Sequence, residues 1–308
     1  MAERLNRRDF MKKSVVFGAS ALLGKRVLNL STADSAEVAV VHGEDLSQTT
    51  RRAVELLGGM GKFVPKNSRV AILPNSQSKN PGAYTKPEIV RAVVRMCREA
   101  GAREVGCLSW LPEKYWEASG LGRAVAEEGA KLSIIDLKDE RLFRPLPLPR
   151  GKALKEAKIM SQFFEYDVFL DLPITKDHAG NRFTGAMKNL MGLNFPTVNR
   201  FFHTGDFKTK PDDIEHLDQC IADLNLALAP TLCLVDATEF LTTNGPFGPG
   251  EIASPRKIVA GVDRVAVDSY CATLLGMRGE DIVMIKRGHE HGLGEIDLKK
   301  VRIREVEA

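Results

Sequence analysis

Apolar residues follow two alternating periods along most of the chain. Short apolar runs bounded by Gly, Pro and Asn are typical of buried strands, whereas apolar residues three and four positions apart are typical of one face of a helix. The helical spacing is clearest where Ile89 and Val93 follow Thr85 and Glu88, which have the spacing of a capping box. The pattern predicts strands at 37–41, 69–73, 104–108, 131–137, 167–172, 232–236, 257–260 and 301–303, and helices at 46–57, 85–101, 121–128, 213–228 and 264–275.

Strands that alternate with helices are typical of an α/β protein whose mostly parallel sheets are covered by helices. The Pro-rich segment 144–151 suits neither a helix interior nor a central strand, which favours a connection between two lobes with a cleft between them. We therefore expect a signal and spacer at 1–35, an N-terminal α/β lobe at 36–150 and a C-terminal α/β lobe at 151–308.

Ligands of open α/β sheets bind beyond the carboxyl ends of the strands. This rule singles out the loops that follow Leu73, Leu172 and Asp236. The loop after Leu172 is unusually long, and structureless loops of such length are uncommon unless they are functional. We expect the site loop at 173–205. It contains two lysines and two histidines, Lys176, His178, Lys188 and His203.

The composition is that of a globular protein, with 44% hydrophobic and 27% charged residues over 308 positions. The net charge is +4, but the first 30 residues contain seven basic side chains against Glu3 and Asp9, so the rest of the chain is close to neutral. A body without a basic stripe argues against binding of DNA or RNA. We expect no nucleic acid partner.

The five cysteines are widely spaced, and the sequence contains no C-x-x-C pair. An iron–sulfur cluster or an all-cysteine zinc site is therefore not expected. Cys97 and Cys233 fall within apolar segments, which predicts that both are core residues.

The N-terminus resembles a twin-arginine export signal. Arg7 and Arg8 are followed by Phe10, Lys12 and an apolar run at 15–23. The run is roughly half of the ~20 residues that span a bilayer, so we expect no stable transmembrane span unless the leader stays uncleaved. The resemblance implies a periplasmic or otherwise exported protein, carried in folded form by the twin-arginine export machinery.

Four motifs resemble the domain of unknown function 362 family over residues 38 to 305. The matching segments are P-x-x-K-x-H ending at His178, T-G-A-x-K-N-x-x-G beginning at Thr184, the Asn75 loop with T-x-P, and A-G-x-D-x-x-A-x-D ending at Asp268. The family resemblance implies no particular reaction. Some relatives carry a ferredoxin-like module with Cys-rich motifs, which this chain lacks, so no such cluster is carried over.

The order of His178, Lys188 and His203 also resembles the lactate racemase family. That resemblance implies that Lys188 anchors a nickel-pincer nucleotide, that His178 is the catalytic acid or base and that His203 binds nickel. The residue types suit this chemistry, because imidazole binds nickel and titrates near neutrality. Two features depart from the racemase pattern: Gly185–Ala186 replaces a paired glycine, and 107–110 lacks the second catalytic histidine.

Two functions therefore stay open. One is a cofactor- or metal-dependent isomerase or oxidoreductase acting on a small hydroxy or carboxylic acid, with nickel, another transition metal or a nucleotide-derived group as cofactor. The other is a non-catalytic protein that binds or delivers an anionic small molecule or cofactor through its lysine charges. In both, we expect Lys188, His178 and His203 to line one cleft. Lys176 and Asn189 would lie at its rim, and Asn75 would reach in from the first lobe.

Overall fold

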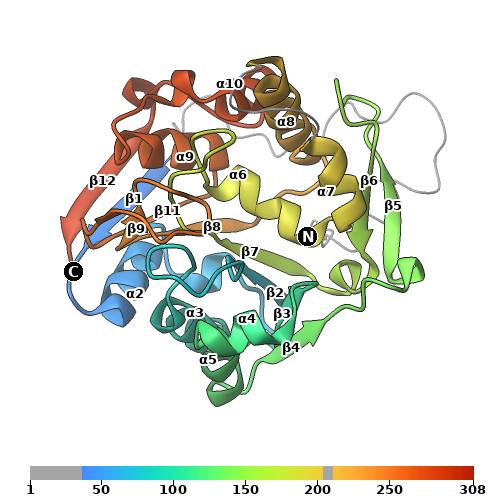
Figure 1. Ribbon diagram of the computed structural model, residues 1–308. Helices are drawn as coiled ribbons and strands as arrows, with labels where there is room; N and C mark the ends of the chain where they lie inside the picture. Colours follow the sequence, from blue (N-terminus) through green and yellow to red (C-terminus); the bar gives the residue numbers. More distant parts are fainter. Residues whose placement is uncertain (1–36, 204–210) are drawn as a thin grey trace, which may run out of the picture.

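The central sheet of the protein has eight strands in the order β12-β1-β11-β8-β7-β2-β3-β4 (Figure 1). The computed structural model describes residues 37–203 and 211–308, and the predicted signal at 1–35 lies outside the described residues. The strands of this sheet are β1 (Glu37–His42), β2 (Arg69–Pro74), β3 (Glu104–Ser109), β4 (Lys131–Ile134), β7 (Val168–Leu172), β8 (Leu232–Ala237), β11 (Lys257–Gly261) and β12 (Arg302–Glu307). Two small sheets pair β5 (Phe143–Pro147) with β6 (Glu156–Met160) and β9 (Phe240–Leu241) with β10 (Ile252–Ala253).

Helices cover both faces of the central sheet (Figure 1). The first group is α2 (Leu46–Leu56), α3 (Pro87–Glu99), α4 (Glu113–Ala118) and α5 (Leu121–Glu127), and it packs in one apolar cluster with one face of the strands. The second group packs in another cluster on the opposite face: α6 (Ala186–Asn189), α7 (Pro196–Phe202), α8 (Pro211–Leu224), α9 (Arg264–Thr273) and α10 (Val283–Glu290). Short 3₁₀ helices lie at Met60–Lys62, Glu140–Leu142, Ser161–Glu165, Leu190–Leu193, Gly279–Asp281 and Leu298–Lys300.

The sheet is mostly parallel, as the sequence predicts. Strand β11 runs antiparallel to its neighbours β1 and β8, and the other neighbouring pairs are parallel. Alternate residues of β1 enter the two clusters, with Val38 and Val40 on one face and Ala39 and Val41 on the other. The α/β class with a helix-covered, mostly parallel sheet is therefore confirmed.

The predicted boundary at residue 150 does not separate two sheets. Strand β1, from the stretch 36–150, lies between β11 and β12, from the stretch 151–308. Its residues from Val38 to Val41 are fully buried, which requires neighbours at both edges and on both faces. The Pro-rich segment forms β5, which pairs with β6 outside the central sheet, where a missing N–H is tolerated.

The predicted capping box at Thr85 does not form. The N-cap of α3 is Lys86, without a side-chain hydrogen bond, and Pro87 occupies the first turn. The Thr85 hydroxyl instead donates to the Leu172 carbonyl at 2.7 Å and accepts from the Asn75 amide at 3.0 Å. Local spacing favoured a cap, but the tertiary partners on β7 and on the loop after β2 take the hydroxyl.

Several short elements carry no clear period and were not predicted, namely α4, the β9 and β10 pair, and α10. The segment after Leu172, expected as irregular, contains α6 and α7.

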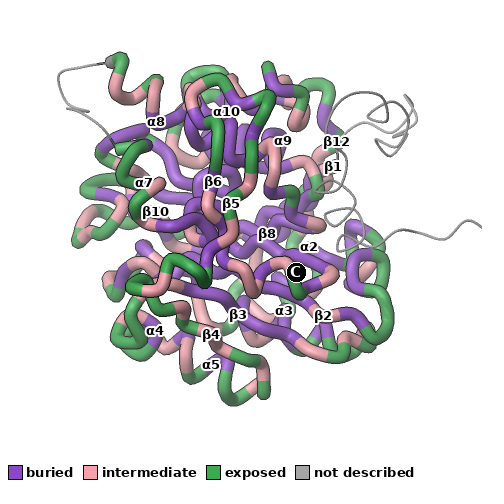
Figure 2. Tube along the Cα trace, turned by 90° about the vertical axis from the view of Figure 1, so that its right-hand side faces the viewer, coloured by how far each residue is buried: buried purple, intermediate pink, exposed green. Residues whose placement is uncertain are grey.

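Cys97 and Cys233 are buried, which confirms their predicted place in the core, and the three other cysteines are buried as well. Figure 2 shows the buried interior along the strands and the exposed loops around it. Within 37–203 and 211–308, no helix has the length and apolar character needed to cross a membrane.

Candidate functional site

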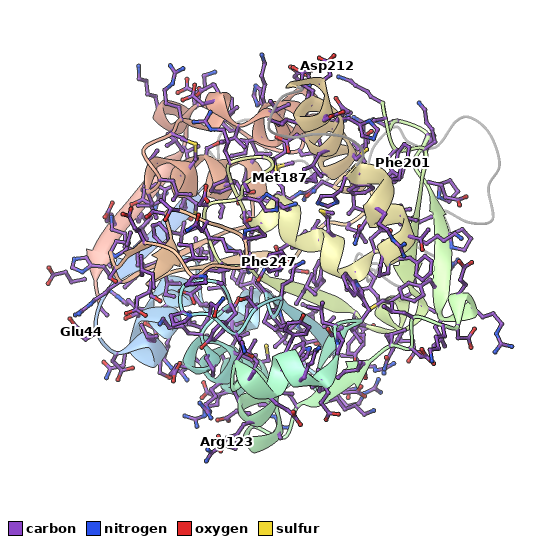
Figure 3. The ribbon with its side chains drawn as sticks, in the orientation of Figure 1. Glu44, Arg123, Met187, Phe201, Asp212 and Phe247 are labelled. Carbon is purple, nitrogen blue, oxygen red and sulfur yellow. The ribbon has the colours of Figure 1, made fainter. Side chains whose placement is uncertain are left out.

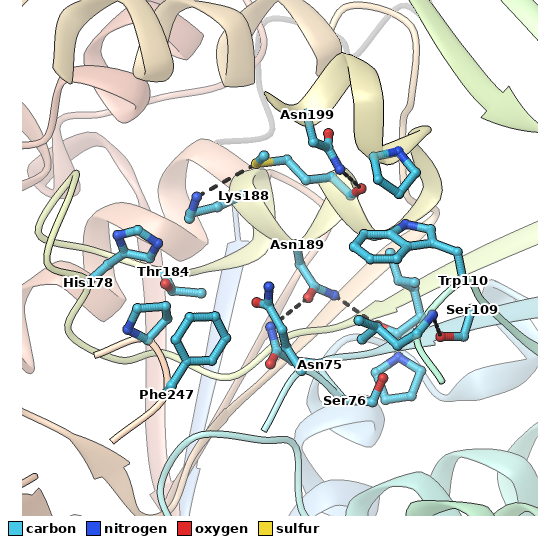
Figure 4. Close-up of a pocket in the computed structure, with 18 of the residues that line it drawn as sticks. Asn75, Ser76, Ser109, Trp110, His178, Thr184, Lys188, Asn189, Asn199 and Phe247 are labelled. Atoms are coloured by element: carbon cyan, nitrogen blue, oxygen red, sulfur yellow. Dashed lines mark hydrogen bonds between the residues drawn. The ribbon is translucent and has the colours of Figure 1, made fainter. Parts of the chain in front are cut away.

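A cavity of about 470 Å³ opens at the carboxyl ends of β2, β3 and β7, where ligands of this type of sheet bind (Figure 4). Its wall includes residues from the loops after these strands and from α6 and α7, together with Pro246 and Phe247. Of the predicted site residues, five line this cavity: Asn75, His178, Lys188, Asn189 and His203. The structure therefore brings together groups that lie up to 128 positions apart in the sequence.

Lys188 supplies a buried ammonium group to the cavity. The residue is 9% exposed and lies on the short helix α6. Its Nζ donates to Met191 Sδ at 3.6 Å, and no ion pair with a carboxylate forms within the described part of the chain. Burial lowers the pKa of Lys188 to about 8, against the opposing effect of the Asp218 charge. The ammonium thus faces the cavity without a strong acceptor.

His178 lies beside Lys188 in the cavity wall (Figure 4). Its Nδ1 accepts a hydrogen bond from the Gly180 amide at 3.0 Å, so the neutral ring carries its proton on Nε2. Burial, and then the charge of Lys188, lower the pKa of His178 to about 2. The ring is therefore a neutral hydrogen-bond donor at physiological pH.

Thr184 completes a group of three donors and was not predicted as a site residue. Its side chain lies between His178 and the rest of the cavity in Figure 4, and the residue is 3% exposed. The hydroxyl Oγ1 is buried and has no hydrogen-bond partner among the described residues. A threonine by itself does not indicate a functional site. The one sequence feature that could have identified Thr184 is its place as the first residue of the T-G-A-x-K-N-x-x-G motif.

His203 lies at the exposed rim of the cavity, on the C-terminal end of α7. Its Nδ1 contacts the Asn199 carbonyl at 2.8 Å, and because a carbonyl only accepts, Nδ1 is the donor and the neutral ring carries a lone pair on Nε2. Partial loss of hydration, and then the Lys188 charge, lower the pKa of His203. His203 and His178 thus adopt opposite tautomers.

Lys176 does not lie at the rim, where it was predicted. It is fully buried, and its Nζ donates to the Ala83 carbonyl at 2.5 Å and to Asn75 Oδ1 at 3.2 Å. Asn75 Nδ2 then donates to Asn189 Oδ1 at 3.1 Å, and Asn189 Nδ2 donates to Leu73 O at 2.9 Å and Asp171 Oδ1 at 2.7 Å. Lys176 therefore lies behind the cavity wall and bonds to Asn75, which with Asn189 lines the cavity. Burial, followed by repulsion from Lys188, lowers the pKa of Lys176 to about 7.

Asp268 holds the turn that carries Thr184 and Lys188. Its two carboxylate oxygens accept hydrogen bonds from the backbone amides of Ala186 at 2.6 Å and Met187 at 2.9 Å. Burial raises the pKa of Asp268 to about 7 despite these two bonds. Asp268, the last residue of the A-G-x-D-x-x-A-x-D motif, therefore contacts the site through the backbone amides of α6.

The described residues do not fit a metal centre built from protein side chains. No group of three or more His, Cys, Asp or Glu that could hold a metal ion occurs among them. Of the two histidines that line the cavity, His203 has the tautomer of a metal-binding imidazole, with Nδ1 donating to a carbonyl, whereas His178 offers N–H. The predicted nickel or nucleotide-derived cofactor stays a prediction.

The fold defines an α/β protein with an open, mostly parallel sheet and a cavity at the carboxyl ends of its strands. The family model described as domain of unknown function (DUF362) matches residues 70–273, and the chain belongs to this family. The family predicted from the motifs is thereby confirmed.

The chain is similar to proteins with different names. A thylakoid-associated protein of Synechocystis sp. is 28% identical over 240 residues, which cover 75% of this chain and 70% of that protein. The lactate racemase apoprotein from Thermoanaerobacterium thermosaccharolyticum has a TM-score of 0.47 at 14% identity, and the match covers 76% of this chain and 58% of the racemase chain. TrmN from Thermus thermophilus has a TM-score of 0.25 at 13% identity, over 70% of this chain and 48% of the TrmN chain.

Proposed function

We propose that the cavity binds a small organic anion whose charged group is held by Lys188, Thr184 and His178. The observation that carries this proposal is the buried Lys188 ammonium, which has only a thioether as hydrogen-bond partner within 37–203 and 211–308. Asp218 acts on Lys188 through its charge but forms no ion pair with it. Burial of an ammonium that makes no ion pair is unfavourable, and an anionic ligand in direct contact would reduce that cost.

The neighbouring groups support an anion rather than a cation. His178 presents N–H, and the Thr184 hydroxyl is an unused donor. Burial, and then the charge of Lys188, lower the pKa values of His178, His203 and Lys176, and the second cause indicates several cationic groups at one place. A carboxylate can accept several such bonds at once.

An enzyme that acts on the bound acid is the second candidate, and the orientation of His203 favours it. Because its Nδ1 donates to the Asn199 carbonyl, the neutral His203 ring has its basic nitrogen at Nε2, and a general base needs a tautomer fixed in this way. The same reasoning makes His178, predicted as the acid or base, better suited to donate a hydrogen bond to the ligand. Under this candidate, the acid would be a small hydroxy or carboxylic acid.

A change of Lys188 to methionine tests the binding proposal. We expect Lys188→Met to weaken the binding of lactate and related carboxylates by at least tenfold, because an ion pair in a desolvated site is lost. The free energy of unfolding should stay constant or rise, because the variant no longer buries an uncompensated ammonium. Titration calorimetry measures the affinity, and urea denaturation measures the stability.

The matched control is Lys66→Met, an exposed lysine for which neither affinity nor stability should change. Equal affinity of Lys188→Met and wild type would contradict the proposal. A loss of several kcal/mol of stability would instead identify Lys188 as a structural partner. NMR spectra of the incubated acid separate the two candidates: a pure binding protein leaves the acid unchanged, whereas an enzyme exchanges its Cα hydrogen or forms a product.

We also propose that the twin-arginine segment exports the protein. The relative from Synechocystis sp. is named thylakoid-associated, which is compatible with a protein that leaves the cytoplasm. The paired Arg7 and Arg8 with Phe10 support this route.

A further inference from the structure

The two ends of the cavity differ in chemistry. Figure 4 shows His178, Thr184 and Lys188 at one end and Trp110 at the other, with Asn75 and Asn189 between them. Leu108 and Leu111, the apolar neighbours of Trp110 in the chain, also line the cavity, whereas the Met191 sulfur contacts Lys188 Nζ at 3.6 Å and Phe247 lies at the His178 end.

Two polar side chains of the wall near Trp110, Ser109 and Asn199, already bond to the protein, and the Trp110 indole N–H is buried without a partner among the described residues. Ser109 Oγ accepts the Leu111 amide at 3.0 Å, a bond that also fixes the turn presenting Trp110. Asn199 Nδ2 donates to the Met191 carbonyl at 3.0 Å, and its Oδ1 accepts from Asn194 at 2.9 Å. Apart from Ser76, Gln77 and the exposed Arg200, which also line the cavity, the wall around Trp110 therefore offers mainly apolar surface to a ligand.

The volume argues against a very small ligand. A cavity of about 470 Å³ lies in the range of pockets that enclose molecules of drug or cofactor size. A bare hydroxy acid at Lys188 would leave the surface of Trp110 and Leu111 covered by water. Burial of that apolar surface by the ligand would add favourable free energy of binding.

We infer that the ligand is an amphiphilic organic acid, with its carboxylate at Lys188, Thr184 and His178 and an aromatic or apolar body against Trp110. This inference rests on the proposed function, because it assigns the ligand's anionic group to the Lys188 end. It goes further by naming Trp110 as the residue that determines specificity. A tryptophan face beside aliphatic side chains suits a flat ring.

A matched pair of probes, 3-phenyllactate and lactate, tests this assignment on the full chain. The two acids share one head group and differ by a phenyl ring. We expect wild type to bind phenyllactate about 30-fold more tightly than lactate, from burial of roughly one ring. In Trp110→Ala this preference should fall to about threefold or less, whereas Trp110→Phe should keep most of it, because the aromatic face is retained.

Fluorescence and ligand-observed NMR provide separate readouts. The chain has two tryptophans, and Trp116 is buried at 1% exposure, so phenyllactate should change the emission of wild type but not of Trp110→Phe, even though NMR still shows binding. Equal affinities of wild type for the two acids, or an unchanged preference in Trp110→Ala, would overturn this inference alone. Failure of both acids to bind wild type, or binding unaffected by Lys188→Met, would overturn the proposed function.

Discussion

Single charged residues acquire their chemistry from burial in this protein. Lys188 and Lys176 have the same side chain, but one faces the cavity and the other is bonded to Ala83 and Asn75 behind it. His178 and His203 likewise differ in which nitrogen carries the proton. His178 Nδ1 accepts a hydrogen bond from the Gly180 amide, whereas His203 Nδ1 donates one to the Asn199 carbonyl. Residue type alone therefore did not assign the roles.

The pH dependence of binding follows from the Lys188 ammonium. With a pKa of about 8 in the free protein, Lys188 is protonated below pH 8 and loses its charge above it. Carboxylic acids are ionised above about pH 5. The affinity should therefore be highest near pH 6 and fall as the pH rises, because Lys176, with a pKa of about 7, and then Lys188 lose their charges while Asp218, with a pKa of about 7, gains one. Calorimetric titrations of phenyllactate between pH 6 and 10 measure this profile.

Lys188→Arg serves as the control for the pH profile, because a guanidinium stays charged over the whole range, and its affinity should not fall above pH 8. An equal fall above pH 8 in Lys188→Arg would show instead that a group other than Lys188 determines the profile.

At the scale of elements, the turn from Phe183 to Lys188 is held by α9. Asp268 on α9 accepts hydrogen bonds from the first two backbone amides of α6. This contact requires a residue without a side chain at position 185. A Cβ atom at Gly185 would lie 2.3 Å from Asp268 Oδ1 and 2.6 Å from Phe183 Cε1. The backbone of Gly185 has φ −156°, so space and not the dihedral angle requires glycine.

We expect Gly185→Ala to lower the free energy of unfolding by about 2–4 kcal/mol, because the added methyl displaces Asp268 from two buried amides. Lys188 should also shift, so the affinity for carboxylates should decrease. Urea denaturation gives the stability change. Gly61→Ala is the control: a Cβ there meets no atom within 4 Å, and its effect should stay below about 0.5 kcal/mol. A similarly small effect at position 185 would show that Asp268 does not constrain the turn.

For the whole molecule, the strand order joins both halves of the chain in one sheet and one cavity. Loops after β2 and β3 supply Asn75 and Trp110, and the segment after β7 supplies His178 and Lys188. The cavity wall therefore needs loops from both halves of the chain. An export route that carries folded proteins, as the N-terminal resemblance implies, suits such a protein.

Export is tested by fusing residues 1–40 to a reporter. Changing both Arg7 and Arg8 to lysine should abolish export, because the paired arginines are the address that the machinery reads. The fusion leaves out nearly all of the described protein, where charged residues such as Glu44, Arg123 and Asp212 lie at the periphery (Figure 3), so a change in export is assigned to the leader. Arg4→Lys, outside the pair, should export normally. Export that survives the double change would show that the segment is not a twin-arginine signal.

Much of the local structure followed from the sequence. Apolar periods located every strand of the central sheet and most of the longer helices, because burial on one or two faces leaves a direct mark on the residue pattern. The rule that ligands bind at strand carboxyl ends identified the loops after β2 and β7, and the lysines and histidines there were visible by residue type. The family motifs drew attention to the same loops.

Only the tertiary structure decided which of these groups face the cavity and which protonation state each of them has. The place of β1 between β11 and β12, the bonds that bury Lys176, and the proton positions on His178 and His203 all depend on partners distant in sequence. Thr184 and Trp110 became site residues for the same reason. Periodicity records how each segment meets the core, but the pairing of strands and the burial of a charge depend on contacts between segments, which a local pattern does not contain.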